Sequence, residues 1–106
     1  RDGNISIITQ ERASITELAK KLQILYSRFK NDNIIVNLSS LMSLTTGDVI
    51  EFLQISNRHR NANHSFILVT NKIKIDDIPE EIAIVPTLQE AYDIIEMEEM
   101  ERDLGF

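Results

Sequence analysis

The chain has no cysteine and no tryptophan, and its 106 residues include only two histidines, three glycines and two prolines. The lack of cysteine excludes the disulfide framework of small secreted domains and favours a cytoplasmic protein. Two histidines without cysteine cannot form a structural zinc site of the usual kind. No apolar run approaches the roughly 20 residues that a membrane-spanning helix needs, and none has the form of a secretory signal. We therefore expect no metal and no membrane-spanning segment.

The three glycines, Gly3, Gly47 and Gly105, are scattered along the chain. A phosphate-binding loop or a dinucleotide fingerprint needs several glycines close together, so neither can form here. The acidic residues between 76 and 81 lack the alternating ligand spacing and the turn glycine of an EF-hand. We expect a protein without a cofactor and without enzymatic activity.

Charge is distributed unevenly along the chain. Residues 75–106 hold eleven acidic residues and one base, Arg102, whereas residues 1–74 hold ten bases and six acids. An acidic surface repels phosphate backbones and anionic lipids, so we expect neither nucleic acid nor a membrane as a partner. The acidic third is interpreted either as a solvated helix face or as a docking surface for a basic protein. We expect a monomer or a weak homodimer.

Short apolar and β-branched runs predict strands at 5–9, 34–38, 65–70 and 82–85. Apolar residues three and four apart predict helices at about 15–29, 46–57 and 88–100, followed by a tail at 101–106. Capping-box spacings mark two of the helix starts, at Ser14 and at Thr87. In the last helix, the side chains predicted to point inward are Leu88, Ala91, Tyr92, Ile95 and Met100.

Strands and helices therefore alternate, and only the polar stretch 72–81, which contains Pro79, breaks the alternation. The strands at 34–38 and 65–70 are nearly continuous apolar sequence, as in a sheet covered on both faces. These features predict an α/β fold with a mainly parallel sheet of four to five strands and amphipathic helices. We expect one domain over residues 1–106, with its core at about 5–100.

The start of the second helix carries Thr45, Thr46, Gly47 and Asp48. It places hydroxyl groups beside free backbone amides at the positive end of a helix dipole. One interpretation is a helix cap. The other is a surface for a protein partner or a hydroxyl that a kinase modifies, where a phosphate would add about −1.5 to −2 charges.

An alternative site lies in the polar segment Arg58, His59, Arg60 and His64. These side chains could bind a small anion, or serve an enzyme, if they converged on a pocket. The simpler interpretation is a solvated turn between a helix and a strand.

Three consecutive stretches resemble the STAS domain family, typified by bacterial anti-sigma factor antagonists: Ile34-Ile35-Val36-Asn37-Leu38, the loop Ser39–Leu44, and Thr45-Thr46-Gly47-Asp48. The resemblance implies a regulatory module in signal transduction that binds an anti-sigma-factor-like kinase or another regulatory protein. It places the phosphoacceptor on Thr46 in an ungapped comparison, or on Thr45 when Gly47 is matched to the family glycine. The partner-binding residues that it implies are Ser39, Ser40, Ser43, Thr45, Thr46, Gly47 and Asp48.

The C-terminal stretches 85–91 and 101–106 also resemble a subgroup of short acidic STAS-like bacterial proteins that is sometimes labelled ribonuclease Z. That label implies a site with two metal ions, which requires a cluster of histidines and aspartates. His59 and His64 alone cannot supply it.

Overall fold

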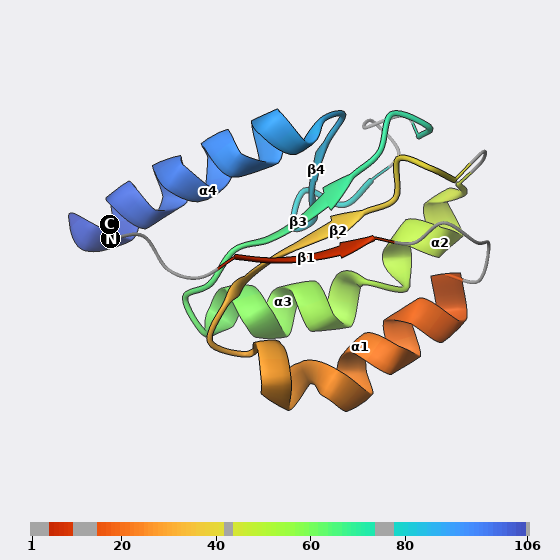
Figure 1. The fold of residues 1–106 in the computed structure, drawn as a ribbon, viewed down its shortest axis with the longest axis horizontal. Coiled ribbons are helices and arrows are strands. Elements are labelled where there is room, and N and C mark those ends of the chain that lie inside the picture. Colours follow the sequence, from red (N-terminus) through yellow and green to blue (C-terminus); the bar gives the residue numbers. More distant parts are fainter. Residues whose placement is uncertain (1–4, 10–14, 42–43, 74–77, 106) are drawn as a thin grey trace.

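The computed structural model of the chain describes residues 5–9, 15–41, 44–73 and 78–105 (Figure 1). Its elements in chain order are β1 (Ile5–Thr9), α1 (Ile15–Phe29), β2 (Asn33–Asn37), α2 (Thr46–Ile50), α3 (Leu53–Asn61), β3 (Phe66–Val69), β4 (Ala83–Val85) and α4 (Leu88–Asp103).

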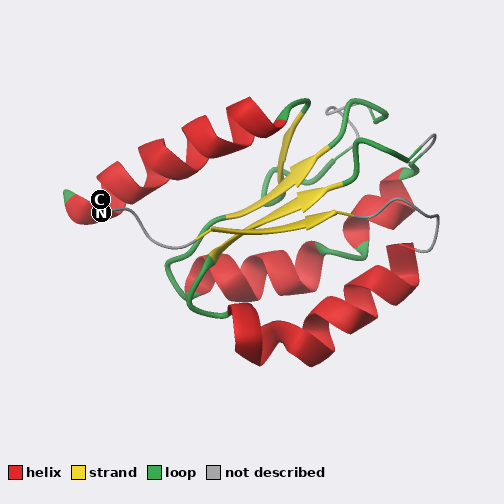
Figure 2. Ribbon diagram, viewed as in Figure 1, coloured by secondary structure: helices red, strands yellow, loops and turns green. Residues whose placement is uncertain are grey.

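The strands form one sheet of four strands in the order β1-β2-β3-β4, and all neighbouring strands are parallel. The predicted α/β fold with a parallel sheet is therefore confirmed. Helices α1, α2 and α3 lie on one face of the sheet and α4 lies on the other (Figure 2). Right-handed crossovers between strands that follow one another in sheet order place the connecting helices on the same face. The last helix connects no further strand, and it covers the opposite face.

Side chains of β2 alternate between two cores. Ile34 and Val36 belong to the larger core with α1, α2 and α3, whereas Ile35 belongs to the smaller core under α4. Both sides of this strand are covered, which explains why its sequence shows no polar alternation. The edge strand β1 is less covered because α4 packs against β2, β3 and β4. As a result, Ile7 of β1 is 42% exposed.

The second predicted helix is divided in the structure. It forms α2 and α3, and Phe52 lies between them with φ −90° and ψ −5° and without a side-chain cap. At this point the Phe52 amide donates to the Val49 carbonyl at 3.0 Å, three residues back rather than four. Phe52 and Val49 are completely buried. The tighter turn keeps both apolar side chains in the core, although the predicted helix is not continuous.

The last helix differs from its prediction in two ways. It continues to Asp103, so residues 101–103 are helical rather than part of a tail. Ala91 and Ile95 are buried as predicted, but Tyr92 and Met100 are 37% and 58% exposed. The predicted inward positions were wrong there because α4 meets the sheet along a narrow line of side chains. The predicted cap Ser14 lies outside the described residues.

Candidate functional site

The loop after β2 leaves the carboxyl end of the sheet, where ligands of open α/β sheets commonly bind. Asn37 ends β2, and its Oδ1 accepts hydrogen bonds from the Ser39 backbone amide at 3.1 Å and from the Ser39 hydroxyl at 2.7 Å. Leu41 and Leu44 are buried, whereas Ser39 and Ser40 are exposed. The buried leucines thus anchor a segment that displays hydroxyl groups. Ser43, another predicted contact, lies outside the described residues.

Thr45 begins α2 as its N-cap. Its Oγ1 accepts the Asp48 amide at 3.1 Å, and the Asp48 carboxylate accepts the Thr45 amide at 3.0 Å. This reciprocal capping box identifies Thr45 as the helix cap, because Thr46 is already the first residue of the helix. Thr45 and Gly47 are exposed, and Thr46 and Asp48 are half-buried.

One turn beyond Thr46, Ile50 is 45% exposed. The described residues 39–41 and 44–48, together with Ile50, are called the 39–48 face below. The set includes the predicted docking residues that the structure describes, and it combines exposed hydroxyl groups with the exposed apolar side chain of Ile50.

His59 contradicts the prediction of a solvated turn, because it is completely buried. Its Nε2 hydrogen-bonds the Asp32 carbonyl at 2.5 Å, and its Nδ1 lies 2.7 Å from the Tyr26 hydroxyl. A carbonyl oxygen only accepts, so Nε2 carries the proton and the Tyr26 hydroxyl donates to Nδ1. Burial lowers the pKa of His59 below its usual 6.5, an effect that the bond to Asp32 partly offsets. His59 is therefore a neutral, fully bonded core residue and cannot bind an anion.

Arg58 also turns away from the predicted anion site. Its guanidinium carbon lies 4.4 Å from the centre of the Tyr26 ring, a cation–π contact. Burial raises the pKa of Tyr26, and the charge of Arg58 partly offsets this effect. Arg58, His59 and Tyr26 thus join α1 to α3.

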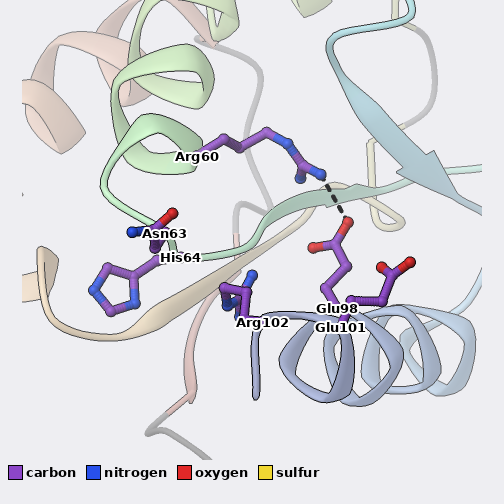
Figure 3. Close-up of a pocket in the computed structure, with 6 residues that line it drawn as sticks. All are labelled: Arg60, Asn63, His64, Glu98, Glu101 and Arg102. Atoms are coloured by element: carbon purple, nitrogen blue, oxygen red, sulfur yellow. Dashed lines mark hydrogen bonds and ion pairs between the residues drawn. The ribbon is translucent and has the colours of Figure 1, made fainter. Parts of the chain in front are cut away.

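The other half of the predicted anion site, Arg60 and His64, does line a cavity, of about 280 Å³ (Figure 3). The cavity adjoins the amino ends of β2 and β3. The 39–48 face lies at the other end of the sheet, where the carboxyl end of β2 is. The remaining side chains around the cavity are Asn63, Glu98, Glu101 and Arg102. Arg60 Nη2 lies 2.7 Å from Glu98 Oε2. Both cationic and carboxylate side chains therefore line the cavity, and Arg60 and Glu98 already form an ion pair.

A network of hydrogen bonds connects this cavity to the sheet. The Ser65 hydroxyl donates to Glu98 Oε1 at 2.6 Å, and the Ser65 amide donates to Asn33 Oδ1 at 2.8 Å. Arg102 reaches the same Asn33 oxygen at 3.4 Å. Ser65 and Asn33 are buried at the starts of β3 and β2. We call the set Asn33, Arg60, Ser65, Glu98 and Arg102 the α4 latch, because it ties α4 to the sheet and to α3.

Sequence reasoning missed the members of the α4 latch that come from the strands and from α4. Its hydrogen bonds join residues that lie 32 to 69 positions apart in the sequence, and a local sequence pattern cannot predict contacts over such separations. One signal was present, since Arg102 is the single base in the acidic third of the chain.

Two further properties concern the described residues as a whole. Among them there is no group of three or more histidines, cysteines or acidic residues placed to hold a metal ion. No helix in the same part of the chain has the length and apolar character needed to cross a membrane.

No protein-family model matches the chain, and no curated protein matches it. The resemblance to the STAS family rests on the sequence motifs and on the order of elements.

Proposed function

We propose that the protein is a non-enzymatic regulatory module of the STAS type, which acts in the cytoplasm by binding a protein partner through the 39–48 face. The observation that carries this proposal is the geometry of the face. Buried leucines and the Thr45–Asp48 capping box fix the backbone, while Ser39, Ser40 and Thr45 are exposed. Little conformational entropy is then lost when a partner contacts these groups.

The same geometry supports a phosphorylation switch at Thr45 or Thr46, in which the modifying enzyme is an anti-sigma-factor-like kinase. A phosphate on either residue lies beside the positive end of the α2 dipole. Phosphorylation of Thr45 and phosphorylation of Thr46 would have different structural effects. Thr45 Oγ1 is the acceptor of the cap bond, so its modification disturbs the capping box. Modification of Thr46 leaves that bond in place and adds charge to the docking face.

The docking proposal is tested by quantitative affinity capture from the native cell. We expect one protein to be recovered with the unaltered chain and its recovery to fall at least about tenfold with Thr46→Arg and Ile50→Arg, as for residues at the centre of an interface. Ile24→Arg is the matched control, because Ile24 is 77% exposed on α1. Equal recovery with all three variants would contradict the proposal.

The switch is tested by mass spectrometry of the protein from its native cell. Cleavage after lysine and arginine releases residues 31–58 as one peptide, which holds Thr45 and Thr46. We expect a phosphorylated form of this peptide in at least one growth state. Its absence in all growth states, at a sensitivity that detects about one molecule in a hundred of a synthetic phosphopeptide standard, would exclude the switch and leave the docking proposal intact.

The cavity at Arg60 favours a second candidate function, the binding of a small anion. Arg60 Nη1 is buried and has no hydrogen-bond partner among the described residues. Glu98 and Glu101 line the same cavity and oppose an anion. Titration with inorganic phosphate tests this candidate, which predicts saturable binding that Arg60→Gln removes and Arg58→Gln preserves. No binding at millimolar phosphate would exclude it.

A further inference from the structure

Helix α4 carries a second apolar surface besides the one that packs on the sheet. Ile94, Met97, Met100 and Leu104 follow one another at spacings of three, three and four, which places them along one side of the helix. Met97, Met100 and Leu104 are 56%, 58% and 69% exposed. We call these four residues the α4 stripe. They present uncovered apolar surface over about 15 Å of helix length.

The α4 stripe continues into an apolar groove beside the edge strand β4. Ile94 lines this groove, which has a volume of about 510 Å³. Ile78, Pro79, Ile82, Ala83 and Ile84 form most of the remaining wall, together with Glu80. The exposed side of α4 and the free edge of the sheet thus share one apolar surface through Ile94.

The exposed charged side chains of α4 have one sign. The exposed acidic residues of α4 are Glu90, Asp93, Glu96, Glu101 and Asp103. Arg102, the single base on the helix, directs its guanidinium toward Ser65 and Asn33 and is half-buried. Consequently no cation from α4 neutralises the acidic residues beside the α4 stripe.

We propose that the α4 stripe and its groove bind a basic amphipathic helical segment of a protein partner. A helix in a groove places apolar side chains at spacings of three and four, which matches the α4 stripe. Methionine side chains adapt to apolar partners of varied shape. Lysine or arginine residues beside the apolar positions of the partner would face the acidic residues of α4.

Charge also argues against other occupants of the surface. A second copy of the chain would bring two acidic helices together, and an anionic membrane would be repelled. Helix α4 lies on the opposite face of the sheet from α2 (Figure 2), and the groove lies beside the edge strand β4 without any residue of the 39–48 face in its wall. The proposal is therefore independent of docking through the 39–48 face, and either can fail without the other.

The test uses the full chain and a synthetic peptide of about 15 residues that has leucines at spacings of three and four and lysines at the other positions. Fluorescence anisotropy measures its affinity. We expect the double change Met97→Ser and Met100→Ser to weaken binding at least about tenfold. Ile24→Ser, which removes an exposed apolar side chain from α1, is expected to leave the affinity unchanged.

Charge is tested in the same assay. Glu96→Gln with Glu101→Gln is expected to weaken binding and to reduce its dependence on salt, whereas Glu51→Gln on the opposite face leaves both unchanged. A scrambled peptide of the same composition is expected to bind at least about tenfold more weakly. Equal binding of the scrambled peptide would overturn the proposal. Self-association of the chain that the methionine changes abolish would also overturn it, because a second copy would then occupy the surface.

Discussion

At the scale of single residues, His59 shows most clearly how burial decides chemistry. The sequence places it among arginines and asparagines, yet its ring is buried between Tyr26 and Asp32 and makes two hydrogen bonds. It stacks on His64 with ring centres 5.2 Å apart. A neutral histidine in this position fixes how α3 packs on α1 and on the start of β2.

This arrangement predicts a loss of stability in mild acid. The pKa of folded His59 is lowered, so between neutral pH and the folded pKa the unfolded chain binds a proton that the folded chain does not. The stability contributed by His59 is thus complete above about pH 6.5 and declines as the pH falls. Urea unfolding at about pH 7.5 and pH 5.5 is expected to show this decline, with a smaller decline for His59→Gln.

The control is His64→Gln, which changes the neighbouring histidine and is expected to keep most of the pH dependence. If His59→Gln and the unaltered chain lose the same free energy of unfolding between the two pH values, His59 is not the group responsible.

Thr45 gives a second prediction at this scale. Thr45→Ala removes the side-chain cap of α2 and is expected to lower the free energy of unfolding by about 1 kcal/mol. Thr46→Ala removes no cap bond and is expected to change it by less than about 0.5 kcal/mol. Urea denaturation checks both, with Thr45→Ser as the variant that keeps the cap. A larger loss from Thr46→Ala than from Thr45→Ala would contradict the assignment of the cap.

At the scale of elements, local sequence patterns predicted where helices and strands form. The bounds of β1 and α1 agree with prediction because strand composition and helical spacing are local properties. The break between α2 and α3 was not predictable, since Val49, Phe52 and Ser56 continue the helical spacing across it. In α4, apolar residues lie on two sides of the helix. The sequence pattern correctly placed Ala91 and Ile95 against the sheet, but it could not show that Tyr92 and Met100 remain exposed.

The α4 latch leads to a prediction about the attachment of α4. Glu98→Ala leaves the Ser65 hydroxyl, which belongs to a completely buried residue, without its acceptor and leaves Arg60 without its ion pair. The loss of a buried partner costs about 1–3 kcal/mol of unfolding free energy. Glu101→Ala, in the same cavity, is expected to cost less than about 0.5 kcal/mol. Urea denaturation measures both variants. Equal losses of unfolding free energy from Glu98→Ala and Glu101→Ala would show that the α4 latch contributes nothing beyond general surface charge.

At the scale of the whole molecule, the two faces of the sheet differ in how firmly they are covered. Three helices share the larger core, whereas α4 alone covers the opposite face and buries only Ala91 and Ile95 of its own side chains. Elements with few buried apolar contacts open at lower free energy. We therefore expect α4 amides to exchange with deuterium through a local opening that leaves β2 and β3 protected. If the amides of α4 and those of β3 exchanged with the same free energy of opening, this difference would be contradicted.

Prediction from sequence succeeded for the fold and only in part for the site. The element order and the parallel sheet follow from repeated local patterns. The 39–48 face is a contiguous segment apart from Ile50, so most of its residues were named from the sequence, and its role in docking stays a prediction. The cavity at Arg60 combines α3, α4 and the strand starts, and only Arg60 and His64 among its residues were anticipated.

Docking of a partner on the 39–48 face can be tested by site-specific photo-crosslinking in the native cell. A photoreactive residue replaces Ile50 in one variant and Ile24 in the other, two positions exposed by 45% and 77% on different helices. We expect one discrete protein adduct from position 50 that is missing from position 24. The same adducts from both positions, or none from position 50, would contradict it.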